Sequence, residues 1–488
     1  MNMLTSFTAT ALLLVPLSAL AGEAPLTITF QISRILKDTT EHPLGIQDPT
    51  FLADVTGSGA AIRRLGVRFL RIGDPRDAFW SEPPWERANP VAVLSGPSAW
   101  PANDRNYMDA DGRHFRADRT TDFDESLALA QAAGAEPIVI LTYNSLYKPP
   151  ADGLVIPPRE RFFAAAEAQV RYALRRKVRI RYWELGNELW NRGSNGHGPV
   201  ALADIRRDLA VLVPRLRAID PGIRILVSGD SGTWYRQLLE SAPLLDAVNF
   251  SWYLWEMSDG YESFRASPDL LGGTAAFTGA LAAIDALPPL NRDRIGVVIT
   301  EFNALDWAAT TVAAPGGRPG WENRNDLGHA LCVFQMAGEA LAHPRVRLAS
   351  YWCSQWMWPP WQPKIELDSV YNALRQDGSP TATGLAVAAW GNHLLDAFVQ
   401  VSAPDPLLRT WASRSTDGKR LHVFLLNKDR NSRRVTLHGG DAPWKATGAW
   451  RLAGDGPRDL HPRWEQVPAD VSLLLPSDSA TVVHLAIR

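Results

Sequence analysis

Two glutamates in matching sequence contexts carry the clearest chemical signal in this chain. Glu188 ends residues 182–188, Tyr-Trp-Glu-Leu-Gly-Asn-Glu, and Glu301 follows the apolar run of residues 295–299, Ile-Gly-Val-Val-Ile. Both positions are typical of the ends of buried strands. Such a pair can cleave a glycosidic bond, because one carboxyl group protonates the leaving oxygen while the other acts at the anomeric carbon. Either glutamate alone could be a solvated loop residue, but the pair in strand register favours catalysis.

Residues 43–396 alternate short apolar runs with longer amphipathic stretches. The expected strands are residues 43–47, 67–74, 136–144, 179–188, 223–230, 247–253, 295–303 and 345–352. The expected helices include residues 159–174, 202–219, 274–287 and 325–342. Continuous apolar strands between helices predict parallel β/α units that are covered on both faces. Eight such strands predict an α/β fold, a (β/α)8 TIM barrel. A doubly wound sheet is the alternative, although no Gly-rich phosphate turn follows an early strand.

The pattern changes after residue 396 to short strands separated by turn residues. The expected strands there are residues 407–413, 421–426, 434–437, 450–452, 471–475 and 480–487. This spacing predicts an all-β sandwich over residues 397–488. Residues 26–32 also alternate apolar and polar side chains, as in a sheet with one buried face. We therefore expect the N-terminal segment, residues 22–42, to supply a strand to the sandwich.

The first residues have the pattern of an export signal. Residues 11–20 form a short apolar run, and Ala19-Leu20-Ala21 fits a small-x-small cleavage rule. No Lys or Arg precedes the run, which departs from the usual signal. We expect residues 1–21 to be a signal peptide and the protein to be exported, to the periplasm or the medium. No later segment is long and apolar enough to predict a membrane span.

The composition of the chain limits the kinds of partner and cofactor that we expect. The formal net charge is -2 over 488 residues, so electrostatics favour neither nucleic acid nor an acidic membrane surface as a partner. The only two cysteines, Cys332 and Cys353, do not make a disulfide framework, and inert thiols are the favoured interpretation. No Cys/His group has the spacing of a metal site, so we expect no metal and no cofactor.

Residues 183–188, Trp-Glu-Leu-Gly-Asn-Glu, and 300–303, Thr-Glu-Phe-Asn, resemble glycoside hydrolase clan A, the retaining TIM-barrel glycosidases. The resemblance is nearest to the α-L-arabinofuranosidase and β-xylosidase branches. It implies that Glu188, ending the fourth strand, is the general acid/base and that Glu301, ending the seventh, is the nucleophile. Their carboxyl groups would then lie about 5 Å apart. Asn187 would hold the sugar hydroxyl next to the anomeric carbon.

The resemblance also assigns supporting residues. Arg71, in residues 69–74, matches the second-strand arginine that would orient the nucleophile, and a salt-bridged structural arginine is the alternative. Tyr253 matches the tyrosine of a His-x-Tyr pattern and could hydrogen-bond the nucleophile, but Ser251 stands where histidine is usual. Trp352, ending the eighth strand, would form a platform under the sugar, unless it is a core residue.

Position alone suggests further substrate contacts. Asn144 ends the third strand and Asp74 follows the second, so both could meet substrate hydroxyls, and Trp356 lies in a Trp-rich segment after the eighth strand. Glu184 shares strand parity with Glu188 and should form a buried ion pair, because a charge inside a barrel needs a partner.

Tryptophans in loops suggest a wall of a sugar-binding cleft. We expect at least two of five indoles to face the same cavity as the glutamates: Trp252, Trp255, Trp352, Trp356 and Trp358. A cleft suits endo action, whereas the motifs resemble exo-acting enzymes, so the mode of action stays open. The predicted function is retaining hydrolysis of a plant or bacterial polysaccharide or its oligosaccharides. A non-catalytic carbohydrate-binding protein and a metal-assisted barrel enzyme are the alternatives.

Overall fold

A computed structural model gives the architecture of most of the chain. It describes residues 25–48, 55–73, 123–147, 158–191, 199–254, 257, 259–306, 321–322, 324–355, 370–375, 377–403, 405–439 and 443–487. The predicted signal peptide lies outside these residues, as do four of the side chains singled out above: Asp74, Trp255, Trp356 and Trp358.

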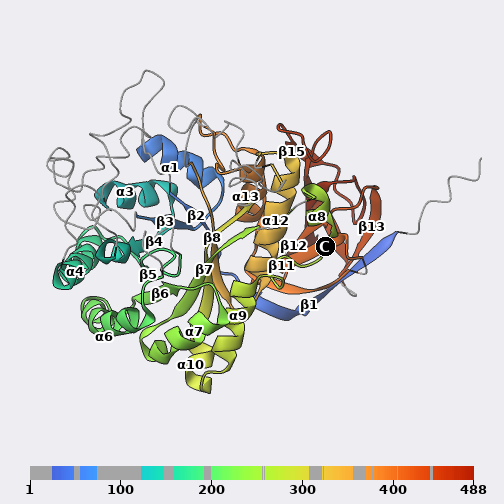
Figure 1. Cartoon of the computed structure of the whole chain (residues 1–488). Coiled ribbons are helices and arrows are strands. Elements are labelled where there is room, and N and C mark those ends of the chain that lie inside the picture. The colour runs from blue at the N-terminus through green and yellow to red at the C-terminus, as the bar shows by residue number, and fades with distance from the viewer. Residues whose placement is uncertain are drawn as a thin grey trace, which may run out of the picture.

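Eight parallel strands close into a barrel, which confirms the predicted fold (Figure 1). They are β2 (Leu44–Gln47), β3 (Phe69–Ile72), β4 (Glu136–Leu141), β5 (Tyr182–Leu185), β6 (Arg224–Ser228), β7 (Ala247–Leu254), β8 (Gly296–Asp306) and β9 (Val346–Tyr351). Each falls on one of the expected apolar runs. An inner cluster fills the barrel: Phe69, Ile138, Tyr182, Leu226, Ala247, Val298 and Leu348. The barrel is therefore a packed core, and ligands must bind at its ends.

Helices surround the barrel, as the β/α pattern predicts. They are α1 (Val55–Arg64), α3 (Phe123–Ala133), α4 (Arg159–Arg175), α6 (Leu202–Ile219), α7 (Gly232–Leu238), α8 (Tyr261–Ala266), α9 (Ala275–Asp285), α10 (Pro289–Arg294), α12 (Leu327–Ala342) and α13 (Ala382–His393). Short 3-10 turns add η4 (Tyr143–Leu146) and η5 (Leu239–Leu244). Helix α12 is buried on all sides because it packs on β8 and β9 and also on β11, β12 and β17 of the second sheet.

The second domain is a curled nine-stranded sheet in the order β15-β14-β17-β12-β11-β10-β1-β13-β16. Its strands are β1 (Leu26–Asp38), β10 (Ala397–Ser402), β11 (Leu408–Arg414), β12 (Arg420–Asn427), β13 (Arg433–His438), β14 (Trp444–Ala453), β15 (Arg463–Val467), β16 (Ser472–Leu475) and β17 (Ser479–Ile487). The curl encloses its own core, which includes Ile28, Val399, Val423 and Val483.

Strand β1 joins this sheet, as its alternation predicted. It pairs antiparallel with β10 and parallel with β13, so the first described strand and the C-terminal strands share one sheet (Figure 1). Two strands, β10 and β15, were not anticipated. Strand β15 reads Arg-Trp-Glu-Gln-Val and lies at the edge of the sheet, where a strand needs no continuous apolar run.

Aromatic side chains join the barrel to the sheet. Trp390 of α13 stacks on Phe424 of β12 with ring centroids 3.9 Å apart, and Phe334 of α12 packs beside both. All three are fully buried. This dry contact holds the two domains together.

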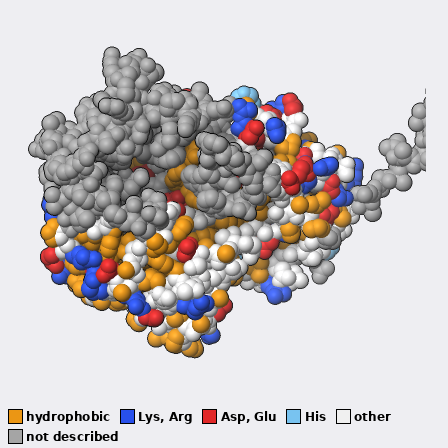
Figure 2. Space-filling view, viewed as in Figure 1, with side chains coloured by type: hydrophobic (Ala, Val, Ile, Leu, Met, Phe, Trp, Pro, Cys, Tyr) orange, Lys and Arg blue, Asp and Glu red, His pale blue; other side chains and the backbone are white. Residues whose placement is uncertain are grey.

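Both cysteines, Cys332 and Cys353, are free and buried, in agreement with inert thiols. Within the described residues, no helix is both long and apolar enough to span a membrane. Acidic, basic and apolar side chains intermingle on the face drawn in Figure 2, and neither charge sign forms a continuous field on its described part.

Candidate active site

Arg71 lies at the centre of a buried polar network inside the barrel mouth. It projects from β3 and is 1% exposed. Its Nη1 donates to Oε1 of Glu301 at 2.7 Å and to the side-chain oxygen of Gln47 at 2.8 Å. Its Nη2 donates to Oδ1 of Asn187 at 2.7 Å, and its Nε donates to Glu184 at 2.7 Å. One guanidinium thus holds four side chains from three segments of the barrel, namely β2, β8, and β5 with the turn after it.

Glu301 lies at the carboxyl end of the barrel but not at the end of its strand. Strand β8 continues to Asp306, paired with the extended β7, so the predicted strand end at residue 303 is three residues short. The register pairs Ser251 with Glu301 and Tyr253 with Asn303. Tyr253 reaches back along this ladder, and its hydroxyl donates a short hydrogen bond to Oε2 of Glu301. Glu301 therefore has Arg71 on one oxygen and Tyr253 on the other.

A tight turn after β5 positions Asn187 and Glu188. The strand ends at Leu185, and Gly186 and Glu188 both have positive φ, +66° and +46°. A Cβ on Gly186 would lie 2.5 Å from Oδ1 of Asn144, so only glycine fits there. The predicted strand to residue 188 is thus three residues too long, because the chain must leave the sheet at this glycine.

Asn144 holds this turn from the neighbouring η4. Its Oδ1 accepts from the backbone N of Asn187, and its Nδ2 donates to the carbonyl of Asn187, both at 2.8 Å. Asn144 is fully buried. The structure therefore gives Asn144 a positioning role, where a direct substrate contact was expected.

Glu188 is half-buried and is held from the other side of the turn. Nδ2 of Asn191 donates to its Oε2 at 2.7 Å. The following backbone N, of Leu189, donates to the hydroxyl of Ser228 on β6 at 3.0 Å. Both contacts restrict the direction in which the carboxyl group can point.

Glu184 forms the predicted buried ion pair. It is fully buried, and Arg71 holds it in bidentate fashion while Nδ2 of Asn249 donates to it at 2.8 Å. Complete burial raises the pKa of Glu184, and the bond with Arg71 opposes that increase. Burial alone would lower the pKa of Arg71, but Glu184 and Glu301 together raise it above its ordinary value. Arg71 therefore stays charged.

Tyr253 links the two candidate catalytic carboxylates electrostatically. Burial raises its pKa well above the ordinary value, and the negative charges of Glu301 and Glu188 add to the increase. The phenol is therefore protonated and able to donate to Glu301. Both carboxylates therefore lie close enough to this hydroxyl for their charges to raise its pKa, and Glu301 also accepts its hydrogen bond.

Trp352 lies beside this network and remains partly open. Its ring meets Tyr253 edge-on at 5.8 Å and Tyr371 at 5.4 Å, and its peptide bond to Cys353 is cis. Trp252, by contrast, is 1% exposed and packs on Phe302. Trp252 is therefore a core residue and is not one of the indoles that face the cavity, and Trp255, Trp356 and Trp358 lie outside the described residues. Asp74 also lies outside the described residues.

Sequence reasoning missed three members of the network: Gln47, Asn191 and Asn249. Gln47 ends β2, and a polar residue at the end of a barrel strand could have indicated a site residue. Asn249 lies two residues before Ser251 on the same face of the strand, and this position is weaker evidence for a site residue. Asn191 lies in a loop where no periodicity applies. Among the described residues, the one group able to hold a metal ion lies elsewhere, at His393, His422 and His484.

No protein-family model matches the chain, and no curated protein matches its sequence. Solved structures share its fold. An α-L-arabinofuranosidase from Thermotoga maritima, determined with arabinose, superposes with a TM-score of 0.66 at 16% identity, covering 95% of this chain and 100% of the other. A family 44 xyloglucanase from Paenibacillus polymyxa gives a TM-score of 0.58 at 14% identity over 95% and 100% of the two chains. The chain thus shares its fold with glycoside hydrolases that include an arabinofuranosidase and a xyloglucanase.

Proposed function

We propose that this protein is a retaining glycoside hydrolase that acts on a polysaccharide or its oligosaccharides by double displacement. The proposal rests chiefly on Glu301, which is held by Arg71 at 2.7 Å and by the hydroxyl of Tyr253. A carboxylate that accepts hydrogen bonds from both a guanidinium and a phenol is held in one orientation. A nucleophile needs such a fixed orientation toward the anomeric carbon.

In the first step, Glu301 attacks the anomeric carbon while the bond to the leaving oxygen breaks. Glu188 gives its proton to that oxygen, and the sugar becomes covalently bound to Glu301. The half-buried position of Glu188, fixed by Asn191, suits a group that must meet a substrate oxygen.

In the second step, Glu188, now a carboxylate, takes a proton from water, and the oxygen of that water attacks the anomeric carbon. The ester to Glu301 breaks, and the sugar leaves with its original configuration. Asn187 is anchored by Arg71 and Asn144, so its amide is available at a fixed point for the hydroxyl adjacent to the anomeric carbon. Trp352 supplies an apolar face beside Tyr253.

The test combines a substrate panel with two variants. Aryl glycosides, including α-L-arabinofuranosides and glucosides, and the polymers xylan and xyloglucan would be offered to the wild-type protein. Glu301→Gln should abolish turnover on every substrate that the wild type cleaves. Glu188→Gln should lose most activity on natural substrates but less on aryl glycosides with good leaving groups, which need less protonation.

Glu167→Gln is the matched control, because Glu167 lies on α4 and its ion pairs among the described residues are with the surface arginines Arg171 and Arg215. It should retain full activity. NMR of the first product formed should show the anomer of the substrate, and the opposite anomer would refute double displacement. A wild-type protein that binds the oligosaccharides without cleaving any of them would instead identify a carbohydrate-binding protein.

A further inference from the structure

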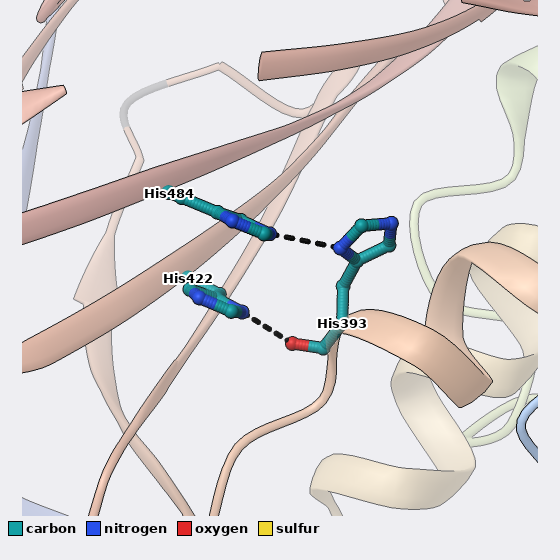
Figure 3. A group of neighbouring side chains, drawn as sticks. All are labelled: His393, His422 and His484. Carbon is teal, nitrogen blue, oxygen red and sulfur yellow. Dashed lines mark hydrogen bonds between the residues drawn. The ribbon is translucent and has the colours of Figure 1, made fainter. Parts of the chain in front are cut away.

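Three histidines that are far apart in the sequence meet between the barrel and the second sheet. His393 is the last residue of α13, while His422 and His484 are cross-strand partners on β12 and β17 (Figure 3). One ligand nitrogen from each lies within 4.8 Å of the other two. Separations of 29 and 62 residues, from 393 to 422 and from 422 to 484, explain why no metal-site spacing appeared in the sequence.

The nitrogen atoms of His393 and His484 already point at one another. Nδ1 of His393 lies 2.8 Å from Nε2 of His484, so one ring donates and the other accepts. The two nitrogens therefore point at the same place, which one shared proton occupies. In a tetrahedral zinc site, with bonds of about 2.0–2.1 Å, two ligand nitrogens lie about 3.3 Å apart. A small expansion of this pair would admit a metal ion in place of the proton.

In the third ring, the hydrogen bond at one nitrogen determines that the other nitrogen carries no proton. Nδ1 of His422 lies 2.6 Å from the carbonyl oxygen of His393, and because a carbonyl only accepts, Nδ1 carries the proton. In the neutral ring, Nε2 of His422 is then unprotonated and can bind a metal. A hydrogen bond from the second ring nitrogen to a backbone carbonyl is how proteins fix the tautomer of a metal-binding histidine.

The surroundings keep all three rings neutral. Burial lowers the pKa of His393 and of His422 to about 4 and that of His484 to about 3. The indoles of Trp450 and Trp464 pack against His393 with centroids 5.0 and 5.7 Å away. Neutral imidazoles in a partly dry site offer lone pairs to a metal without first losing protons.

We propose that His393, His422 and His484 form a transition-metal site, suited to Zn²⁺, that links the last barrel helix to the second sheet. Three imidazoles with water in the fourth position satisfy the coordination of Zn²⁺. The rings of His422 and His484 stack in parallel with centroids 3.5 Å apart, so binding must tilt them toward the common ion. Their ring torsions are soft enough for this movement.

Arg420 is a charged neighbour of the cluster, and it contributes to the lowered pKa of both His422 and His484. It lies at the exposed start of β12, where solvent and salt screen its repulsion of a cation. A metal ion that binds only the folded protein stabilises the folded state by mass action, so the site should raise the stability of the protein.

The experiment uses full-length protein without a polyhistidine tag, treated with EDTA and then dialysed. Zn²⁺ would be titrated by calorimetry, and Co²⁺ by visible absorption, which reports tetrahedral coordination. We expect one Zn²⁺ per chain at this site and a melting temperature that rises with Zn²⁺ concentration. His393→Gln and His484→Gln should each weaken binding at least about 100-fold and abolish the thermal shift.

His438→Gln is the control, because His438 is an exposed histidine of β13 in the same sheet. It should bind Zn²⁺ as the wild type does. Circular dichroism would establish that each variant is folded. Unchanged binding in both His393→Gln and His484→Gln, or no binding by the wild type, would overturn the proposal. Glycosidase activity at room temperature should be the same with and without EDTA, so the metal site and the catalytic proposal can fail separately.

Discussion

Arg71 and Glu301 form a buried ion pair in which the same guanidinium also holds Glu184 through its opposite edge. The distances are 2.7 Å from Nη1 to Glu301 and 2.7 Å from Nε to Glu184. A planar group with five donors can serve both carboxylates at once, together with Gln47 and Asn187. The proposed nucleophile and the residue proposed to bind the sugar hydroxyl are thereby both held by the Arg71 side chain.

Arg71→Lys should therefore cost far more activity than its preserved charge suggests. An ammonium group cannot reach four acceptors from one position, so Glu301 and Asn187 would shift relative to each other. Displacements of about 1 Å cost about 100-fold in rate, and we expect a loss in kcat of that size. Steady-state kinetics on the best substrate of the panel would measure it.

Arg181→Lys is the matched control at the opposite end of the barrel. Arg181 is also buried and is held by Glu136 with bonds of 2.8 Å, but it directly precedes β5 and so lies at the amino end. This variant should lose stability while kcat is retained. Equal kcat losses in both variants would indicate a general folding defect and would contradict the role given to Arg71.

Gly186→Ala should impair catalysis through the backbone. The residue has φ +66°, and the new Cβ would meet Oδ1 of Asn144 at 2.5 Å. Relief of this clash must displace the turn that carries Asn187 and Glu188. Gly134→Ala has nearly the same φ, +67°, but its nearest neighbour is 3.7 Å away. It should cost only about 1 kcal/mol of backbone strain and no activity. Similar activity in both variants would refute a special role for the turn.

The sequence predicts the barrel well because its strands are buried on both faces and therefore carry continuous apolar runs. Boundaries near the site are less predictable. Strand β5 stops at Leu185 because of a glycine geometry, and β8 runs on to Asp306 because β7 extends with it. Both effects depend on contacts between segments that are distant in sequence.

The site was predictable only where a residue stands in a strand motif. Arg71, Tyr253 and Glu301 have such positions, and the structure brings them together. Asn191 lies in a loop without periodicity, and the histidine cluster joins a helix end to two strands. No local sequence pattern predicts the histidine cluster, because the packing of the two domains brings its residues together.

Acid should destabilise the protein partly through His343. Burial, and then the positive charge of Lys37, lower the pKa of His343 from 6.5 to about 4. Its Nδ1 accepts a hydrogen bond from the backbone N of Arg345 at 3.2 Å, which the protonated ring cannot do. Between these two pH values the unfolded chain binds more protons than the folded chain, so stability falls as the pH falls from 6.5 to 4.

His343→Asn keeps an acceptor and removes the titration. Urea denaturation at pH 7.5 and at pH 4.5 should show that the variant loses about 1–2 kcal/mol less stability than the wild type over this interval. Comparing the two losses cancels the constant cost of the missing ring contact with Phe277. An identical pH dependence in the two proteins would rule out a neutral, half-buried His343 as a source of the acid sensitivity.

Trp352 and Trp252 should respond in opposite ways to truncation. Trp352→Ala removes the partly open ring beside Tyr253, so we expect kcat/KM to fall about 10-fold, with a small change in the melting temperature. Trp252→Ala empties a fully buried position and should cost about 3–5 kcal/mol of stability, while the folded fraction keeps its KM. Thermal melts and kinetics on the same preparations would separate the two effects. If Trp352→Ala unfolded the protein as readily as Trp252→Ala and left kcat/KM intact, Trp352 would be a core residue, and the sugar platform would have to be sought elsewhere.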